Sequence, residues 1–274
     1  MSIQIGVIGA GKWGKNILKT LASYPRTIAH IAYGGNEETG RFLQETYSTS
    51  AITKDYHEVL ANPALEAVFI ATPISTHGDI VRDALTAGKH VFVEKPLSTS
   101  TEEIATLYTL AEEKNLTLFP GYLYLFDPEF QALQVKTAAP DELSLEMCWE
   151  KYGTFDTPLA ENLLVHELAL AHELIGTLTL ESVARNETDV CDITVRGERG
   201  TAHIFIDRTQ KEKKKELTVS DGATIETTSF SHNNLLDLEC DAFFVAVARG
   251  SEGNKKRQRI DESIAAVLAS LPRP

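Results

Sequence analysis

Two short stretches of the chain contain the residues best suited to chemistry. A glycine-rich turn of the form Gly-x-Gly-x-x-Gly directly follows the apolar run 3–8, and Lys95 directly follows the apolar run 91–93. Such a turn lets the backbone approach a phosphate group, and the N-terminus of the following helix adds free N–H groups and a partial positive charge. A lysine at the end of a buried strand is partly desolvated, which lowers its pKa towards the range in which an amine can move protons. We therefore expect a dinucleotide-phosphate site and a candidate acid/base.

The glycine-rich turn predicts a cofactor-binding loop between a strand and a helix. Its first glycine permits a tight turn, its second lets the backbone approach a pyrophosphate, and its third lets the helix pack close to the sheet. The alternative is a glycine turn with only a structural role. The residues expected to bind the cofactor here are Gly9, Gly11, Lys12, Trp13 and Gly14.

The end of the second predicted strand leaves the choice between NAD and NADP open. An Asp or Glu there would bind the ribose hydroxyls of NAD and repel the additional phosphate of NADP. The strand instead runs into 33–36, which ends in Asn36, and no arginine stands beside it to bind that phosphate. Glu37 and Glu38 follow, but the helix dipole equally explains acidic residues in a first helical turn.

Composition excludes several classes of protein. The 274 residues carry a formal net charge of -13, so we expect no nucleic-acid partner, because a nucleic-acid binder needs a basic face. The isolated cysteines Cys148, Cys191 and Cys240 form no Cys-x-x-Cys pair, which argues against a disulfide framework or a zinc site. The strand pattern begins at Ile3, which leaves no room for a signal peptide, and no apolar run is long enough to cross a membrane. We therefore expect a cytoplasmic protein with a small-molecule substrate and no membrane partner.

Residues 1–121 alternate between near-continuous apolar runs and amphipathic stretches. This alternation is typical of a parallel sheet covered by helices on both faces, and it predicts an α/β Rossmann domain. The expected strands are 3–8, 28–33, 67–71, 90–94 and 116–119, and the expected helices are 13–23, 37–47, 55–61, 76–87 and 101–114.

Residues 122–274 follow a different pattern, in which several strand-like runs follow one another. Adjacent antiparallel strands explain this best, so we expect an α+β domain with an open, mostly antiparallel sheet. The lysine-rich run 211–215 is interpreted as a solvated hairpin turn. The expected helices are 128–137, 162–175, 236–249 and 261–271, and the expected strands are 143–152, 180–188, 191–196, 201–207, 216–220 and 224–230.

The combination of these motifs resembles the Gfo/Idh/MocA oxidoreductases, the group of glucose-fructose oxidoreductase and inositol dehydrogenase. The resemblance implies a Rossmann domain followed by an open-sheet domain, NAD or NADP as cofactor, and a sugar, polyol or nucleotide-sugar substrate. It also implies a homodimer or homotetramer formed through the exposed face of the second sheet. The matching segments are 9–14, 71–73 with His77, 94–96, 126–128, the helix around His166, and 236–250.

The resemblance assigns roles to individual residues. Lys95 takes the place of the family's acid/base, and Glu94 would position Lys95 or contact the cofactor ribose. On the helix 162–175, His166 takes the place of a second acid/base, and Asn162 stands where the family has an Asp. Asn162 can hydrogen-bond a hydroxyl but cannot take its proton. The other residues implied are Thr72, Pro73 and His77 for the cofactor and Tyr122 and Tyr124 for the substrate.

Several alternatives stay open. A buried helix histidine such as His166 can have a purely structural role. A metal site at His166 would need a second histidine four residues on, but the next is His172, so we expect no metal. Because Asn162 replaces the family's Asp, two rival functions remain: a reductase of a non-sugar substrate, as in the related biliverdin reductases, and a cofactor-binding regulator without turnover.

Overall fold

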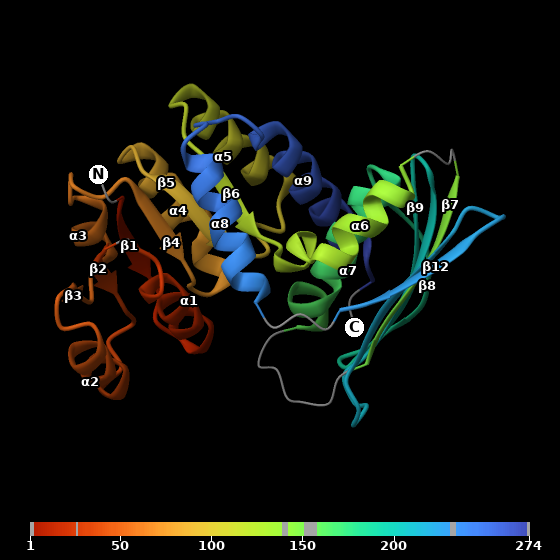
Figure 1. Ribbon diagram of the computed structural model, residues 1–274, viewed down its shortest axis with the longest axis horizontal. Helices are drawn as coiled ribbons and strands as arrows, with labels where there is room; N and C mark the ends of the chain where they lie inside the picture. The colour runs from red at the N-terminus through yellow and green to blue at the C-terminus, as the bar shows by residue number, and fades with distance from the viewer. Residues whose placement is uncertain (1–2, 26, 139–141, 151–157, 231–233, 273–274) are drawn as a thin grey trace. The chain divides into compact units, whose positions relative to one another are not determined.

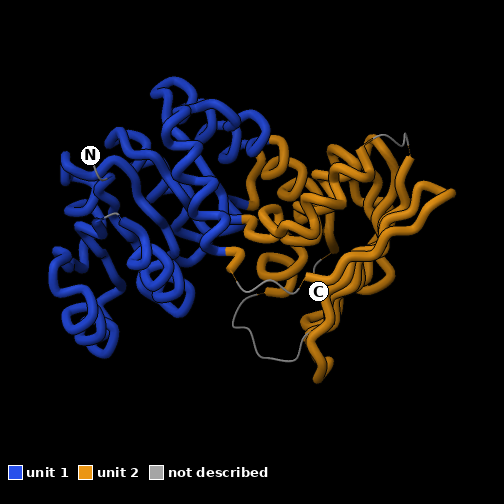
Figure 2. Tube along the Cα trace, viewed as in Figure 1, with its two compact units in different colours: residues 1–98, 102–121, 236–258 blue, residues 99–101, 122–235, 259–274 orange. Residues whose placement is uncertain are grey.

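The computed structural model describes residues 3–25, 27–138, 142–150, 158–230 and 234–272. The chain divides into two compact units, shown in two colours in Figure 2. The first unit comprises residues 1–98, 102–121 and 236–258, and the second comprises 99–101, 122–235 and 259–274. The segment 236–258, which we expected in the second domain, therefore belongs to the first unit. The boundary near residue 121 that we expected coincides with one of these divisions.

The first unit is built on a parallel sheet with strand order β3-β2-β1-β4-β5-β6. Every strand pairing described in it is parallel, as the apolar runs predict. Strand β3 was not predicted, because three residues are too short for a recognisable pattern. The strands are β1 (Gln4–Ile8), β2 (Thr27–Ala32), β3 (Ala51–Thr53), β4 (Ala67–Ile70), β5 (His90–Glu94) and β6 (Leu118–Gly121).

Helices connect these strands close to the predicted positions (Figure 1). Polar side chains fix two of their N-termini: Asn36 accepts a hydrogen bond from the Thr39 N–H, and Asp55 accepts one from the His57 N–H. The helices are α1 (Lys12–Ala22), α2 (Glu37–Thr46), α3 (Tyr56–Leu60), the short turn η1 (Ile74–Thr76), α4 (His77–Thr86), α5 (Thr101–Glu113) and α8 (Leu235–Val247).

Helix α8 packs on the parallel sheet, which explains why its segment belongs to the first unit. The Phe243 ring lies against the rings of Phe69, Phe92 and Phe119, from β4, β5 and β6, with centroid distances of 5.0, 5.7 and 5.6 Å. The hydroxyl of Thr117 lies 3.1 Å from the carbonyl oxygen of Ala246, in the last turn of the helix, and 2.6 Å from that of Gly250, just after it. These are non-local contacts, which the sequence pattern alone does not reveal.

The second unit contains a mixed sheet with strand order β12-β11-β7-β10-β9-β8. The pair β7 and β10 is parallel and the other described pairs are antiparallel, which confirms the expectation of a mostly antiparallel sheet. The predicted strand 143–152 is observed to residue 150, and its last two residues lie outside the described part of the chain. The strands are β7 (Leu143–Glu150), β8 (Thr179–Asn186), β9 (Val190–Gly197), β10 (Gly200–Asp207), β11 (Lys214–Ser220) and β12 (Ile225–Ser229).

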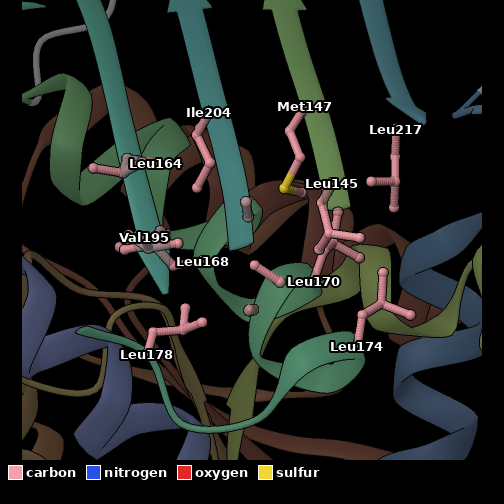
Figure 3. Close-up of a cluster of buried hydrophobic side chains, with 14 of the residues drawn as sticks. Leu145, Met147, Leu164, Leu168, Leu170, Leu174, Leu178, Val195, Ile204 and Leu217 are labelled. Atoms are coloured by element: carbon pink, nitrogen blue, oxygen red, sulfur yellow. The ribbon is translucent and has the colours of Figure 1, made fainter. Parts of the chain in front are cut away.

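Helices cover one face of this sheet (Figure 1). Figure 3 shows leucines of the helical layer, among them Leu168 and Leu174, packed against Leu145 and Ile204 of the strands. The opposite face carries polar groups: His203 contacts both Glu146 and Asp192. The helical segments are η2 (Leu123–Phe126), α6 (Pro128–Lys136), η3 (Ala160–Leu164), α7 (Val165–Ile175) and α9 (Asn254–Ser270), whose first turn belongs to the first unit.

The prediction for the lysine-rich run 211–215 was wrong in two respects. The segment joins β10 to β11, which lie on opposite sides of β7, so it is a crossover rather than a hairpin turn. Residues 211–214 are exposed as expected, but Lys215 is buried. Lys215 shares its side of the strand with Leu217 and Val219, both of which face the core. Among the described residues, no helix is both long enough and apolar enough to cross a membrane.

Candidate active site

The glycine-rich loop lies between β1 and α1, as the sequence predicts. The N–H of Gly9 donates to the carbonyl oxygen of Ala32 at 2.9 Å, which holds the loop against the end of β2. Gly11 is the N-cap of α1 and provides no capping side chain, and the first turn of α1 contains no acidic residue. Nothing in that turn therefore competes with an anion for the positive end of the helix.

The three glycines of the loop have different surroundings. A Cβ atom at Gly9 would overlap the carbonyl of Ala71, and Gly9 has a φ of +100°. A Cβ atom at Gly14 would overlap the carbonyl of Gly9, so this glycine allows α1 to approach the loop. A Cβ atom at Gly11 would meet no heavy atom within 4 Å. Only the middle glycine of the loop thus borders open space, which is where a pyrophosphate must approach the backbone.

Lys95 and Glu94 lie at the carboxyl end of β5, both partly buried. Burial lowers the pKa of Lys95 to about 8, while the carboxylates of Glu94 and Glu239 oppose that shift. Burial raises the pKa of Glu94 to about 7, while the Lys95 ammonium and the Trp13 N–H oppose it. An amine with this pKa can both accept and donate a proton near neutral pH.

Trp13 connects the glycine-rich loop to this strand end. Its indole N–H donates a hydrogen bond to the Glu94 carboxylate, although the two residues are 81 positions apart. The side chain is 38% exposed, unusually high for a tryptophan. The predicted cofactor residues Trp13 and Glu94 are therefore brought together at the carboxyl ends of the strands of the parallel sheet.

His77 joins the loops that follow β4 and β5. Its Nδ1 lies 2.9 Å from the carbonyl oxygen of Pro96, and its Nε2 lies 2.9 Å from that of Thr72. Burial lowers the pKa of His77, and the nearby Lys95 charge lowers it further. A neutral imidazole carries one N–H, so one of the two contacts is a hydrogen bond at any moment. His77 thus fixes the Thr72–Pro73 loop beside Lys95, and its ring is 1% exposed.

Glu239, a buried glutamate on α8, is not among the site residues predicted from the sequence. Its side chain is 1% exposed, and its Oε1 has no hydrogen-bond partner among the described residues. Burial raises the pKa of Glu239 well above its usual range; the charge of Glu94 raises it further, and that of Lys95 opposes the shift. The sequence does contain a signal for its burial: Glu239 precedes Phe243 by four residues and so shares the helix face that packs on the sheet.

In the second unit, His166 and Tyr124 lie in one aromatic cluster. The Tyr124 ring stands edge-on to the His166 ring at 5.1 Å and to the Trp149 ring at 5.5 Å. The Phe230 ring lies 5.5 Å from Tyr124 on the same cluster. His166 is 5% exposed, so the cluster surrounds it closely.

A buried ion pair supports this cluster. Lys215 binds Glu167, the residue after His166, and both side chains are almost inaccessible to water. The Lys215 Nζ also lies 3.8 Å from the ring centroid of Trp149 and 4.3 Å from that of Tyr124. Burial lowers the pKa of Lys215, although Glu167 opposes the shift. The Glu167–Lys215 pair therefore links α7 to β11 at the residue next to His166.

The other two predicted substrate residues have different surroundings. Asn162 is half-buried and lies in the π-helical segment η3, not in a regular α-helix; such wide turns occur often at functional sites. The Tyr122 hydroxyl donates to Asp261 Oδ1 at 2.7 Å, and both residues are buried. This bond ties Tyr122, the residue after β6, to α9.

The structure therefore gathers the predicted residues into two groups. The first, in the first unit, contains the glycine-rich loop with Lys12 at the start of α1, Trp13, the Thr72–Pro73 loop, His77, Glu94 and Lys95. The second, in the second unit, contains Tyr124 and His166. Asn36 lies at the start of α2, where its side chain caps the helix. Within the described ranges, no three His, Cys, Asp or Glu side chains are grouped as a metal site would require.

Comparison with known proteins identifies the family. Residues 3–122 match the model of the Gfo/Idh/MocA family, described as an oxidoreductase family with an NAD-binding Rossmann fold. The chain belongs to the Gfo/Idh/MocA oxidoreductase family. It is 29% identical to the uncharacterised oxidoreductase YrbE of Bacillus subtilis strain 168, over 67% of this chain and 57% of that protein. It is 33% identical to the UDP-N-acetylglucosamine 3-dehydrogenase of Acidithiobacillus ferrooxidans, over 74% of this chain and 63% of that protein. The match thus spans little more than half the length of these relatives.

Solved structures share the fold of nearly the whole chain. A protein of Magnetospirillum magnetotacticum MS-1 superposes with a TM-score of 0.83 at 21% identity, covering 99% of this chain and 100% of that one. A 3-ketoreductase mutant from Actinomadura kijaniata, solved with TDP-benzene and NADP, gives 0.78 at 18% identity, covering 98% and 96%. GenD2 from gentamicin A biosynthesis, solved with NAD, gives 0.82 at 18% identity, covering 98% and 94%.

Proposed function

We propose that this protein is an NAD(P)-dependent oxidoreductase acting on a sugar, polyol or nucleotide sugar. The substrate carbon that exchanges a hydride with the nicotinamide would bear a hydroxyl or carbonyl group. The observation that carries the proposal is the desolvated Lys95 amine at the carboxyl end of a parallel sheet, beside a loop suited to a pyrophosphate. Ligands of open α/β sheets bind at this end of the strands. The relatives named above include proteins that act on a nucleotide sugar or were solved with NAD or NADP.

The glycine-rich loop and its neighbours would hold the cofactor. The open space at Gly11 and the uncapped N-terminus of α1 suit a pyrophosphate. Glu94, fixed by Trp13, and the Thr72–Pro73 loop, fixed by His77, would border the ribose and nicotinamide. Lys12 and Asn36 complete the proposed cofactor residues, and Asn36 occupies the place where an acidic residue would favour NAD over NADP.

Lys95 would move the proton that accompanies hydride transfer. When bound, the nicotinamide supplies or accepts the hydride. In the oxidation of a hydroxyl group, the neutral Lys95 amine accepts the hydroxyl proton. In the reduction of a carbonyl group, the Lys95 ammonium donates a proton to the oxygen. The residues proposed for the second unit are His166 as an assisting acid/base, with Tyr122, Tyr124 and Asn162 as substrate contacts.

We also propose that the polar face of the second sheet pairs with a second copy of the chain. The chain presents this open face, carrying His203 between Glu146 and Asp192, on the side of the sheet away from its core. Light scattering at micromolar concentration would then give the mass of a dimer or tetramer. A monomer under those conditions would contradict this part of the proposal.

A coupled assay tests the proposed activity. The purified protein is first titrated with NADH and NADPH by calorimetry, and then incubated with oxidised or reduced cofactor and a panel of inositols, sugars and nucleotide sugars while the absorbance of reduced nicotinamide is followed. We expect binding of at least one dinucleotide and turnover of at least one member of the panel. Binding without turnover would favour a cofactor-binding regulator. The presence of Asn162 where the family has an Asp is compatible with that alternative.

A further inference from the structure

The direction of α8 places Glu239 over the end of β5. The C-terminal end of α8 lies beside Thr117, just before β6 begins, so the helix runs antiparallel to the strands. Its N-terminal end, which contains Glu239, therefore lies towards the carboxyl ends of the strands. This is the end of the sheet at which Glu94 and Lys95 lie.

Side-chain periodicity brings Glu239 close to Glu94. The Phe243 ring lies on the Phe92 ring at 5.7 Å. Glu239 precedes Phe243 by four residues on the same helix face, about 6 Å along the axis. Glu94 follows Phe92 by two residues on the same strand face, about 7 Å along the strand. The two steps run in the same direction, so the Glu239 carboxyl faces Glu94 and the neighbouring Lys95.

This cluster contains one cation and two carboxyl groups. The titratable groups that the structure describes around Lys95 are Glu94 beside it, Glu239 from α8 and His77 from α4. With both carboxyl groups ionised, the Glu94–Lys95–Glu239 cluster would carry an uncompensated buried charge, which is strongly unfavourable. A proton on Glu239, the most buried of the three, makes the cluster neutral. Its Oε1 has no hydrogen-bond partner among the described residues, which also disfavours an ionised carboxylate.

We propose that Glu239 is a positioning residue that buffers the proton of Lys95. At neutral pH it holds its own proton; as the pH rises, it releases that proton in competition with the amine. Each Glu239 carboxylate formed in this way keeps Lys95 in its ammonium form. The lysine therefore remains able to donate a proton over a wider pH range than it would beside Glu94 alone. This inference rests on the proposed acid/base role of Lys95.

Competitive acetylation measures the Lys95 titration without substrate or cofactor. The full-length protein is labelled with acetic anhydride at a series of pH values, and mass spectrometry gives the modification of Lys95 relative to the exposed Lys19. In the wild type we expect a broad curve, because Glu94, Lys95 and Glu239 compete for protons. In Glu239→Gln we expect a narrower curve, in which only Glu94 is still coupled to the amine, with a midpoint lower by up to about one pH unit.

Asp241→Asn is the matched control, because Asp241 is exposed on the same helix and is not among the charges that act on Lys95. It should leave the Lys95 curve unchanged. Superimposable curves for wild type and a folded Glu239→Gln protein would overturn the inference. If Lys95→Met keeps full turnover while Glu239→Gln shifts the curve, the proposed acid/base role of Lys95 fails and the coupling stands.

The wild-type protein offers a second test that does not depend on a variant folding. Carbon-13 NMR of protein labelled at the glutamate carboxyl carbons follows each carboxyl group with pH. We expect two resonances, those of Glu94 and Glu239, to titrate at or above neutral pH, far from the ordinary glutamate value of about 4.3. If fewer than two resonances titrate there, the inference is wrong.

Discussion

Trp13 donates its indole N–H to the Glu94 carboxylate. This hydrogen bond joins the two stretches of sequence whose residues are best suited to cofactor binding and proton transfer. Trp13 lies in the first turn of α1, within the glycine-rich segment 9–14, and Glu94 immediately precedes Lys95. The bond therefore fixes the loop and the candidate acid/base at one end of the same sheet. It also connects the part of the site suited to a phosphate with the part suited to proton transfer.

Replacing Lys95 by methionine should remove proton transfer while leaving the dinucleotide site intact. Because a positioned acid/base contributes about 10²–10⁴-fold to rate, we expect a loss of that size in kcat with little change in the Kd for the cofactor. Lys89→Met is the matched control, because the Lys89 ammonium is also buried but donates to the carbonyls of Asn62 and Leu65. That variant should lose stability and keep its turnover per folded molecule. Unchanged kcat in Lys95→Met would exclude the lysine from catalysis.

The pH dependence should have opposite signs in the two reaction directions. Lys95 has a lowered pKa of about 8, so its neutral form predominates above that pH and its ammonium form below it. Oxidation, which needs the neutral amine, should rise with pH and level off above about pH 8. Reduction, which needs the ammonium, should fall over the same range. Initial rates measured in both directions check this, and parallel profiles would contradict the assignment.

The glycines Gly11 and Gly14 form a matched pair of variants. Gly11→Ala adds a methyl group where no heavy atom lies within 4 Å, so stability should change by less than about 0.5 kcal/mol. The same methyl group blocks the approach of a pyrophosphate, and we expect cofactor affinity to fall about tenfold or more. Gly14→Ala overlaps the Gly9 carbonyl and should cost about 1–3 kcal/mol of stability. Denaturation and calorimetry separate the two effects; a Gly11→Ala protein with wild-type affinity would argue for a structural turn.

Removing one partner of the Glu167–Lys215 pair should lower the free energy of unfolding substantially. Glu167→Gln leaves Lys215 buried without its carboxylate, which costs about 3–5 kcal/mol in comparable pairs. The double variant Glu167→Leu/Lys215→Met should lose less than the two single variants together. Urea denaturation followed by the fluorescence of Trp149, in a Trp13→Phe background, reports on the second unit. Additive losses would show that the two side chains do not depend on each other.

Local sequence patterns were sufficient to predict most of the helices and strands of the first unit. Strands buried on both faces give continuous apolar runs, so β1, β4 and β5 were recognisable. The first turns of α9 were not predicted, because 254–259 contains only polar residues and therefore shows no apolar periodicity. Asn254 begins that helix and bonds to the backbone of Leu116 and Leu118, a contact that only the folded chain creates.

Only part of the candidate site was predicted, because some of its residues have local sequence signals and others depend on tertiary packing. Gly11 and Lys95 are recognisable because their functions depend on local position, at a turn and at a strand end. Glu239 and Lys215 were missed because charged side chains are ordinarily solvated, and tertiary packing alone buries these two. Lys215 does show a local signal of burial, since alternate residues of a strand point to the same face and Leu217, two residues on, faces the core.

A crystal structure of the protein with bound NAD or NADP tests the central claim most directly. We expect the pyrophosphate at Gly11 against the N-terminus of α1, and the nicotinamide ring beside the Lys95 amine. A dinucleotide bound with its ring away from Lys95 would contradict the proposed chemistry.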